Sequence, residues 1–197
     1  MTLVEDIVVK RLGRVEYATT WEAMRAFTRS RDEATPDELW LLEHPPVYTI
    51  GQGGKSAVPE AIRVDRGGDV TYHGPGQVVV YTLVDLARRG LKVKTFVRLL
   101  EQAVIDLLGP RAERKLGAPG VYVDGAKIAA LGIRVVRGRA YHGVALNVDM
   151  DLSPFSRIDP CGYPGLRVTQ MKDLGFSQTP RMVGERLIER VVEKLDA

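Results

Sequence analysis

This sequence has one cysteine, only three histidines and no long apolar run. A single cysteine excludes an intramolecular disulfide framework and is typical of a reducing compartment, so we expect a cytoplasmic protein. The first ten residues carry Glu5 and Asp6, which predicts neither a signal peptide nor a membrane-spanning segment. No Cys/His spacing matches a zinc site, and no glycine-rich stretch matches a phosphate or dinucleotide fingerprint. We therefore expect no metal and no cofactor.

What the chain does contain is ordinary for a globular protein. Its 197 residues are 45% hydrophobic and 27% charged, which predicts one domain spanning residues 1–197 with a real core. The net charge of +3 is mild and does not argue for nucleic acid, although local basic patches could meet an acidic partner. We expect a monomer that binds neither nucleic acid nor membrane.

Hydrophobic periodicity predicts three helices, at 17–31, at 95–108 and from Thr179–Pro180 onward, with Thr169 capping a further short helix that ends at Gly175. Short strands are predicted at 4–9, 39–43, 47–50 and 78–83. Strands at 121–123, 127–136 and 140–149, joined by tight turns at 124–125 and 137–139, form an antiparallel meander. This order predicts an α+β fold with a mixed, largely antiparallel sheet and packed helices.

The only cysteine, Cys161, lies in a proline- and glycine-rich stretch from Ser153 to Gly165, where neither a regular helix nor a central strand can form. A lone cysteine often packs as a small buried hydrophobe. Its setting between Pro160 and Gly162 instead favours a reactive thiol on a stiff loop.

A nucleophilic thiol needs a neighbour that promotes its ionisation, because a free cysteine is only a few per cent thiolate at pH 7. The candidates are the histidines His44, His73 and His142, and Lys127. Lys127 precedes an almost wholly apolar strand, so its ammonium would be poorly solvated; it could equally be a lysine whose amine snorkels to water. His142 could equally be a strand histidine with satisfied hydrogen bonds.

The densest polar cluster, residues 66–77, places glycines around a short polar strand, where a ligand could lie against the backbone beside Arg66, Thr71 and His73. Such a loop is often only a set of turns. Residues 141–147 form another candidate wall. The basic run 88–94 is either solvated surface or a docking site for an acidic carrier protein.

Four segments, in this order, resemble the octanoyltransferases of lipoic acid biosynthesis, the LipB family. They are His44-Pro-Pro-Val-Tyr-Thr-Ile-Gly-Gln52, Arg66-Gly-Gly-Asp-Val-Thr-Tyr-His-Gly-Pro-Gly-Gln77, Lys127-Ile-Ala-Ala-Leu-Gly-Ile-Arg134 running on to Tyr141-His-Gly-Val-Ala-Leu-Asn-Val148, and Pro160-Cys-Gly162. The resemblance implies an α+β domain like the catalytic domain of lipoate-protein and biotin-protein ligases. It also implies transfer of an octanoyl or lipoyl group from acyl carrier protein to a lysine of lipoyl domains. The expected acceptors are the 2-oxoacid dehydrogenase complexes and the glycine cleavage H protein.

In that family a cysteine holds the acyl group as a thioester and a lysine tunes it, which by motif makes Cys161 and Lys127 a Cys/Lys dyad. The implied substrate-binding residues are Arg66, Gly67, Gly68, Asp69, Val70, Thr71, Tyr72, His73, Ala130, Leu131, Gly132, Gly143, Val144 and Ala145. We expect the acyl chain to lie over Gly67, Gly68, Ala130, Leu131, Gly132 and Ala145, where small residues leave room for eight carbons. The expected oxyanion donors are backbone N–H groups near 76–78 or at Cys161.

Two alternatives stay open on the sequence. An ATP-dependent lipoate- or biotin-protein ligase on the same fold would activate a free acid and would not need Cys161. A non-catalytic acyl- or nucleic-acid-binding module would use the basic run 88–94 and would show no turnover.

Overall fold

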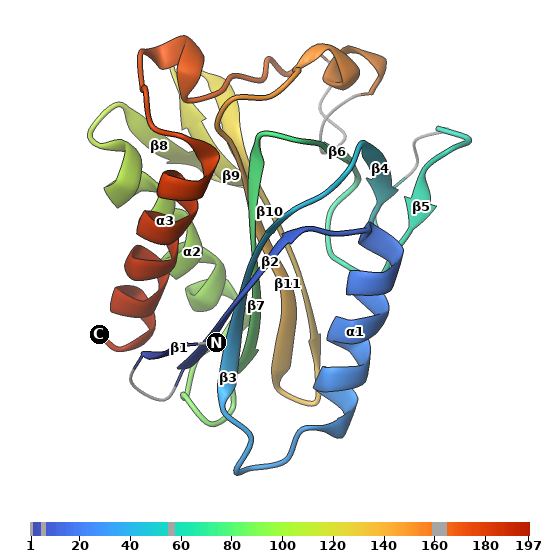
Figure 1. Cartoon of the computed structure of the whole chain (residues 1–197), viewed down its shortest axis with the longest axis vertical. Coiled ribbons are helices and arrows are strands. Elements are labelled where there is room, and N and C mark those ends of the chain that lie inside the picture. Colours follow the sequence, from blue (N-terminus) through green and yellow to red (C-terminus); the bar gives the residue numbers. More distant parts are fainter. Residues whose placement is uncertain (1, 5–6, 55–57, 159–164) are drawn as a thin grey trace.

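The fold is a large sheet with helices on both faces and a smaller sheet beside it (Figure 1). The computed structural model describes residues 2–4, 7–54, 58–158 and 165–197. The helices are α1 (Tyr17–Ser30), α2 (Val93–Leu108) and α3 (Pro180–Leu195), with short 3-10 helices η1 (Ser153–Arg157) and η3 (Lys172–Leu174). The strands are β1 (Thr2–Val4), β2 (Ile7–Arg14), β3 (Asp37–Glu43), β4 (Val47–Ile50), β5 (Ile62–Arg63), β6 (Val70–His73), β7 (Gln77–Asp85), β8 (Ala112–Lys115), β9 (Ala118–Val123), β10 (Ala126–Val136) and β11 (Arg139–Asn147).

The large sheet has the strand order β1-β2-β3-β7-β11-β10-β9-β8, and the small sheet has the order β5-β4-β6. Among the named strands of the described residues, β2–β3 and β4–β5 pair in parallel and the other ladders are antiparallel. The predicted α+β class with a mixed, largely antiparallel sheet is therefore confirmed. The parallel pairing of β2 and β3 follows from the α1 crossover, since parallel neighbours need a long connection.

The two faces of the large sheet are covered differently. Helices α2 and α3 pack on one face over an aliphatic core that includes Ile128, Leu146 and Leu187. Helix α1 crosses the other face over a smaller core with Met24 and Trp40. In Figure 1 the small sheet stands beyond the end of α1, so this second face is only partly covered by the helix. The candidate site lies on that second face.

Local sequence explains the element boundaries. Asp124 and Gly125 both adopt positive φ angles, 49° and 79°, as a two-residue hairpin turn requires. Thr179 caps α3 by accepting a hydrogen bond from the Met182 backbone N–H, and Pro180 follows in the first turn, as predicted. The prediction that Thr169 caps a short helix was wrong. That helix, η3, starts after Met171 with no side-chain cap and ends at Gly175.

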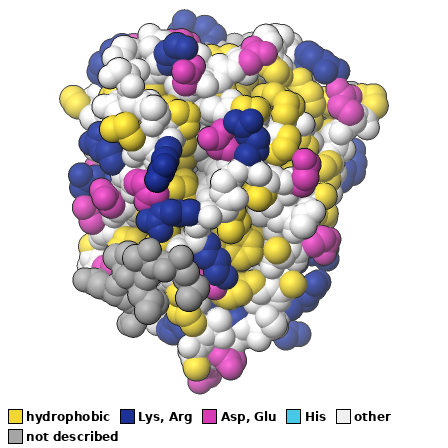
Figure 2. All heavy atoms as spheres, in the orientation of Figure 1, with side chains coloured by type: hydrophobic (Ala, Val, Ile, Leu, Met, Phe, Trp, Pro, Cys, Tyr) yellow, Lys and Arg dark blue, Asp and Glu magenta, His cyan; other side chains and the backbone are white. Residues whose placement is uncertain are grey.

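The surface mixes charges of both signs. Figure 2 shows Lys and Arg side chains interspersed with Asp and Glu over the face in view. Among the described residues, no helix is long and apolar enough to span a bilayer.

Candidate active site

Lys127 lies near the start of β10 and its side chain is buried. Its residue is 3% exposed, and its Nζ donates a hydrogen bond of 3.2 Å to the Pro119 carbonyl. The same Nζ lies 5.3 Å from the centre of the Tyr122 ring. A β-bulge between Lys127 and Ala129 interrupts the pairing with β9 at this point. The ammonium therefore does not snorkel to water, and the alternative of a solvated edge lysine is excluded.

The backbone of Lys127 binds the segment that follows the cysteine loop. Its N–H donates to the Arg167 carbonyl (2.8 Å), and its carbonyl accepts from the Thr169 N–H (2.9 Å). Cys161, Pro160 and Gly162 lie outside the described residues. The described flanks of that segment, Phe155 and Val168, both line a small hollow of about 270 Å³ beside Lys127.

Polar side chains from three strands close this hollow. Besides Lys127, its walls are Thr71, Gln77, Ile128, Ala130, Asn147, Phe155 and Val168. The Gln77 amide donates to the Asn147 side-chain oxygen (2.9 Å), and its carbonyl oxygen lies 2.7 Å from His73 Nδ1. These bonds fix the polar walls before any substrate arrives.

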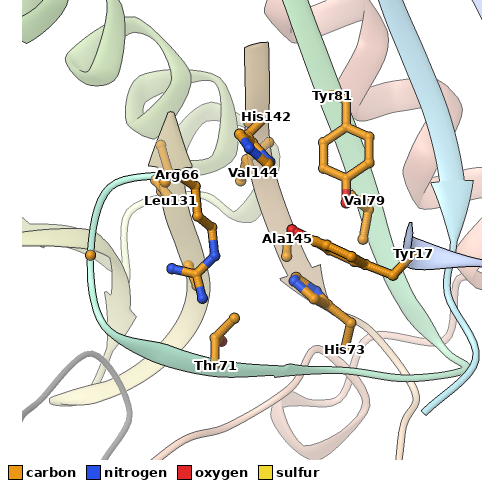
Figure 3. A pocket seen from close by; sticks show the side chains of 14 residues that line it. Tyr17, Arg66, Thr71, His73, Val79, Tyr81, Leu131, His142, Val144 and Ala145 are labelled. Atoms are coloured by element: carbon orange, nitrogen blue, oxygen red, sulfur yellow. The ribbon is translucent and has the colours of Figure 1, made fainter. Parts of the chain in front are cut away.

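A larger cavity adjoins the hollow and shares Thr71 and Ala130 with it. It holds about 460 Å³ of empty space, part of it open to solvent. Figure 3 shows its labelled side chains converging from β6, β7, β10, β11 and the start of α1. Ten of the predicted binding residues line it: Arg66, Gly68, Thr71, His73, Ala130, Leu131, Gly132, Gly143, Val144 and Ala145.

The other four predicted residues do not line this cavity, for reasons of local geometry. Side chains alternate along β6, so Thr71 and His73 face the cavity while Val70 and Tyr72 pack into a separate apolar cluster. Gly67 donates its N–H to the Ile133 carbonyl, and Asp69 accepts from the Val70 N–H. Neighbouring residues of β6, which were all predicted to bind substrate, therefore lie on opposite faces of the strand.

Two glycines line the cavity through their backbone because no side chain fits there. A Cβ at Gly143 would lie 2.1 Å from the Val80 carbonyl oxygen of the neighbouring strand. A Cβ at Gly132 would lie 3.0 Å from the Gly67 carbonyl oxygen. Neighbouring backbone therefore occupies the place that a side chain would take at both glycines, including Gly132, which was expected to leave room for the acyl chain. Ala130 and Ala145 do present small side chains to the cavity.

Sequence reasoning missed three further lining residues, Tyr17, Val79 and Tyr81, whereas His142 belongs to the candidate wall 141–147. Tyr17 is the first residue of α1, and only the packing of that helix on the sheet brings it here. Val79 and Tyr81 belong to a wholly buried strand, in which no alternation of polarity marks the face that meets the ligand. Their position at the cavity depends on tertiary packing, and no local sequence pattern indicates it.

Burial keeps the histidines of this face neutral. Burial lowers the pKa of His44 to about 4 and that of His73 to about 3. His44 Nδ1 lies 2.6 Å from the Val15 carbonyl and must donate to it, so its Nε2 accepts from the Tyr81 hydroxyl at 2.7 Å. Burial also raises the pKa of Tyr17 to about 12. None of these groups is a ready general base at neutral pH.

His142, in the cavity wall, forms a hydrogen-bonded pair with Asp65. Burial lowers the pKa of His142, against the opposing effect of Asp65, whose Oδ1 lies 2.9 Å from the ring Nε2. For Asp65, burial raises the pKa, but hydrogen bonds from His142, Tyr141 and Trp21 outweigh it and hold the net value well below the usual range. A neutral His142 therefore donates its Nε2–H to an ionised Asp65.

Hydrogen bonding narrows two smaller predictions, while the expected oxyanion donor at Cys161 lies outside the described residues. The Gly76 N–H donates to Glu43 (2.8 Å) and the Gln77 N–H to the Gly74 carbonyl (3.1 Å), so neither is available to an oxyanion. In the basic run, Arg88 and Arg89 both bind the fully buried Asp37, at 2.7 and 2.6 Å. They lie just beyond β7, past its Asp85 end, whereas the cavity meets that strand at Val79 and Tyr81. These two arginines serve the fold, whereas Lys92 and Lys94 of the same run are exposed.

Three comparisons place the chain among known proteins. Residues 16–192 match the family model of the lipoyl protein ligase A/B catalytic domain. A protein of Aromatoleum aromaticum named octanoyltransferase is 62% identical over 92% of this chain and 83% of its own length. One of Dechloromonas aromatica, with the same name, is 57% identical over 96% of this chain and 97% of its own length.

Solved structures show the same fold at much lower identity. A bi-partite lipoate protein ligase from Thermoplasma acidophilum superposes with a TM-score of 0.71 at 19% identity, covering 96% of this chain and 84% of its own. Biotin protein ligase from Aquifex aeolicus superposes with a TM-score of 0.55 at 11% identity, covering 98% of this chain and 70% of its own. No three His, Cys, Asp or Glu side chains gather as a metal site would need within the described part. The chain belongs to the lipoyl protein ligase A/B catalytic domain family and, within it, to the octanoyltransferases.

Proposed function

We propose that this enzyme moves an octanoyl group from acyl carrier protein to a lysine of a lipoyl domain through a thioester on Cys161. The observation that carries the proposal is the buried ammonium of Lys127, which lies in a hollow that shares Thr71 and Ala130 with a larger, mostly apolar cavity. A buried amine is the group most able to stabilise a thiolate nearby, and it can also exchange a proton with it.

The position of the described flanks supports Cys161 as the nucleophile. Cys161 is separated by only three positions from Ile158 and by six from Arg167, whose carbonyl accepts from the Lys127 N–H. Phe155 and Val168, on either side of the segment, both line the Lys127 hollow. The chain therefore connects Cys161 to this hollow from both sides in the sequence.

The chemistry has two acyl-transfer steps. The Cys161 thiolate attacks the carbonyl carbon of the carrier thioester, and collapse of the tetrahedral adduct expels the carrier thiolate, which is protonated. The neutral amine of the acceptor lysine then attacks the Cys161 thioester. The new amide forms as the C–S bond breaks, and the proton lost from the amine passes to Lys127 or to the leaving sulfur. An amide is more stable than a thioester, so neither step needs ATP.

The larger cavity is the proposed site of the alkyl chain. Its walls include Leu131, Val144, Ala145 and Val79, which are apolar, and each buried methylene contributes about 0.8 kcal/mol to binding. Arg66 is held in place by hydrogen bonds to the Thr49 carbonyl and hydroxyl, both at 2.8 Å. Its aliphatic stem can therefore serve as wall without requiring a counter-ion from the substrate.

One experiment separates this function from its nearest rival. The native protein is given either octanoyl carrier protein, or free octanoate with ATP, together with a lipoyl domain. We expect transfer only from the carrier, with a mass increase of one octanoyl group on Cys161 when the lipoyl domain is left out. Full transfer by Cys161→Ala would overturn the thioester route.

The rival ligase activity has one observation in its favour, the fold shared with a lipoate-protein ligase A bound with ATP (TM-score 0.70, 18% identity). It predicts the opposite result, with transfer from octanoate plus ATP and no acyl group on Cys161. The non-catalytic alternative predicts no transfer in either arm.

A further inference from the structure

The two ends of the acyl cavity are chemically different. At one end Thr71 and Ala130 also belong to the Lys127 hollow, so the reacting carbonyl lies there in the proposed function. At the other end lie Gly132, Gly143 and the ring of His142. Figure 3 shows this separation, with Thr71 and His73 on one side of the cavity and His142 on the opposite side.

Strand spacing gives the distance between these ends. Ala130 pairs with Ala145, Gly132 with Gly143 and Ile133 with His142 along the β10–β11 ladder. The three steps from Ala145 to His142 therefore span about 10 Å, at about 3.3 Å per residue. An extended octanoyl chain has seven C–C bonds of about 1.5 Å in a zigzag, which gives about 9 Å. A chain that starts at Ala130 and Ala145 therefore ends at the His142 ring.

The backbone at His142 is unusual and directs this ring. Its φ angle of +64° lies in the left-handed region, which a residue with a side chain adopts only where its surroundings enforce it. The Thr82 hydroxyl donates to the His142 carbonyl at 3.0 Å and holds that conformation. Gly143 follows, with its backbone so close to the Val80 carbonyl that a side chain there would clash, so this part of β11 lies tightly against β7.

The ring itself is anchored on the side away from the substrate. Its Nε2 bonds to Asp65, and Asp65 also accepts from Trp21 Nε1 at 2.8 Å and from the Tyr141 hydroxyl. The Tyr141 ring stacks on it with centroids 5.0 Å apart. Pushing the ring aside would break its bond to a carboxylate that is ionised and partly buried, which is costly.

We infer that His142 is the stop that sets the acyl-chain length, with Asp65 as the positioning residue that holds the stop in place. This inference rests on the proposed function, because it assumes that the acyl chain enters from the Lys127 end. Chains longer by two carbons meet the fixed ring, whereas shorter chains leave part of the cavity empty.

The test exchanges the stop for residues that keep the backbone. Asparagine and glycine both tolerate positive φ angles, so His142→Asn and His142→Gly shorten or remove the stop without new strain. Transfer to a lipoyl domain is measured for carrier proteins loaded with six-, eight-, ten- and twelve-carbon chains. We expect the ten-to-eight-carbon ratio of kcat/KM to rise about tenfold, the value of two methylenes at about 0.8 kcal/mol each.

Val79→Ala is the matched control, because Val79 borders the same cavity on its side wall and not at its end. It enlarges the cavity but should leave the ten-to-eight-carbon ratio within about twofold. Asp65→Asn, which keeps the ring but weakens its anchor, should raise the ratio by less than His142→Gly does. It also keeps the test decisive if both His142 variants fail to fold.

The outcomes are separable. A ratio that does not change in folded His142 variants, or that rises equally in Val79→Ala, overturns the stop. Absence of any transfer by the native enzyme overturns the proposed function instead. The stop is then judged by calorimetric binding of free octanoate and decanoate to the native protein and to His142→Gly, where only a gain confined to decanoate supports it.

Discussion

The two faces of the central sheet do different work, and they differ in composition accordingly. Under α2 and α3 the buried side chains are almost all aliphatic, and they form the larger core. Under α1 the buried groups include all three histidines of the chain together with Tyr17 and Tyr81, in mutual ring contact. Buried polar rings cost stability unless each finds a partner. The comparison indicates that one face carries the stability and the other carries the chemistry.

The largest effect should come from the Lys127 ammonium, in the hollow that adjoins the larger cavity. Lys127→Met keeps the aliphatic stem and removes the charge, so we expect single-turnover transfer to fall about 10²–10⁴-fold, the usual contribution of a positioned acid–base group. The unfolding free energy should change little. Lys115→Met is the control, because the Lys115 ammonium lies 4.5 Å from the same Tyr122 ring on a more exposed side chain. Equal losses in both variants would contradict a specific role for Lys127.

On the face covered by α2 and α3, we expect a substitution to lower stability and leave the transfer rate unchanged. Leu187→Ala removes a side chain that is completely buried in the aliphatic core, and the resulting cavity should lower the unfolding free energy by about 2–5 kcal/mol. Urea denaturation measures this loss. The folded fraction should keep its kcat, and a chain-length preference altered by this variant would break the division between the faces.

Acid should weaken the cavity face first. Unfolded histidines titrate near pH 6.5, whereas burial holds the folded pKa of His44 at about 4 and of His73 at about 3. Below pH 6.5 the unfolded chain therefore binds more protons, and stability falls as the pH drops. Both contributions are fully present above pH 6.5. We expect a loss of about 2–4 kcal/mol between pH 7 and pH 5 from these two groups together.

The measurement is urea denaturation at several pH values in that window. His73→Asn should reduce the slope of the unfolding free energy against pH by the equivalent of close to one proton. The remaining slope should come from His44. A stability that is flat from pH 7 to pH 5 would mean that the two rings are not held neutral by the fold.

The smallest effect concerns the start of α3. Thr179→Ala removes the hydroxyl that accepts from the Met182 N–H, which should cost about 1 kcal/mol and leave transfer unchanged. Thr179→Ser keeps the acceptor and should stay close to the native stability. Equal losses in the two variants would show that the cap contributes nothing.

Local signals in the sequence were enough for most of the fold. The turns at Asp124–Gly125 and Arg137–Gly138 fix the β9–β10–β11 meander, because their residues tolerate the positive φ angles that two-residue hairpins require. The Thr179–Pro180 pair likewise fixes the start of α3. The edge strand β8 was missed, since Ala112–Lys115 is short and mostly polar and is held only by its pairing with β9.

The site was harder to predict, for a physical reason. Motif residues such as Thr71, Ala130 and Ala145 were identified because they are close in sequence to other recognisable residues. Tyr17 and Tyr81 reach the cavity only because α1 packs across β7 and β11, a contact that no local pattern encodes. Lys127 stands between these cases. Its apolar neighbours predicted burial, but its hydrogen bond to Pro119 depends on the pairing of β9 with β10.

The paired backbone bonds of Lys127 to Arg167 and Thr169 are independent of its side chain, so any replacement other than proline leaves them in place. Position 127 can therefore be rebuilt with shortened or unnatural amines while the returning chain stays docked. Differences in turnover among such derivatives would then report on the amine alone, its basicity and its reach.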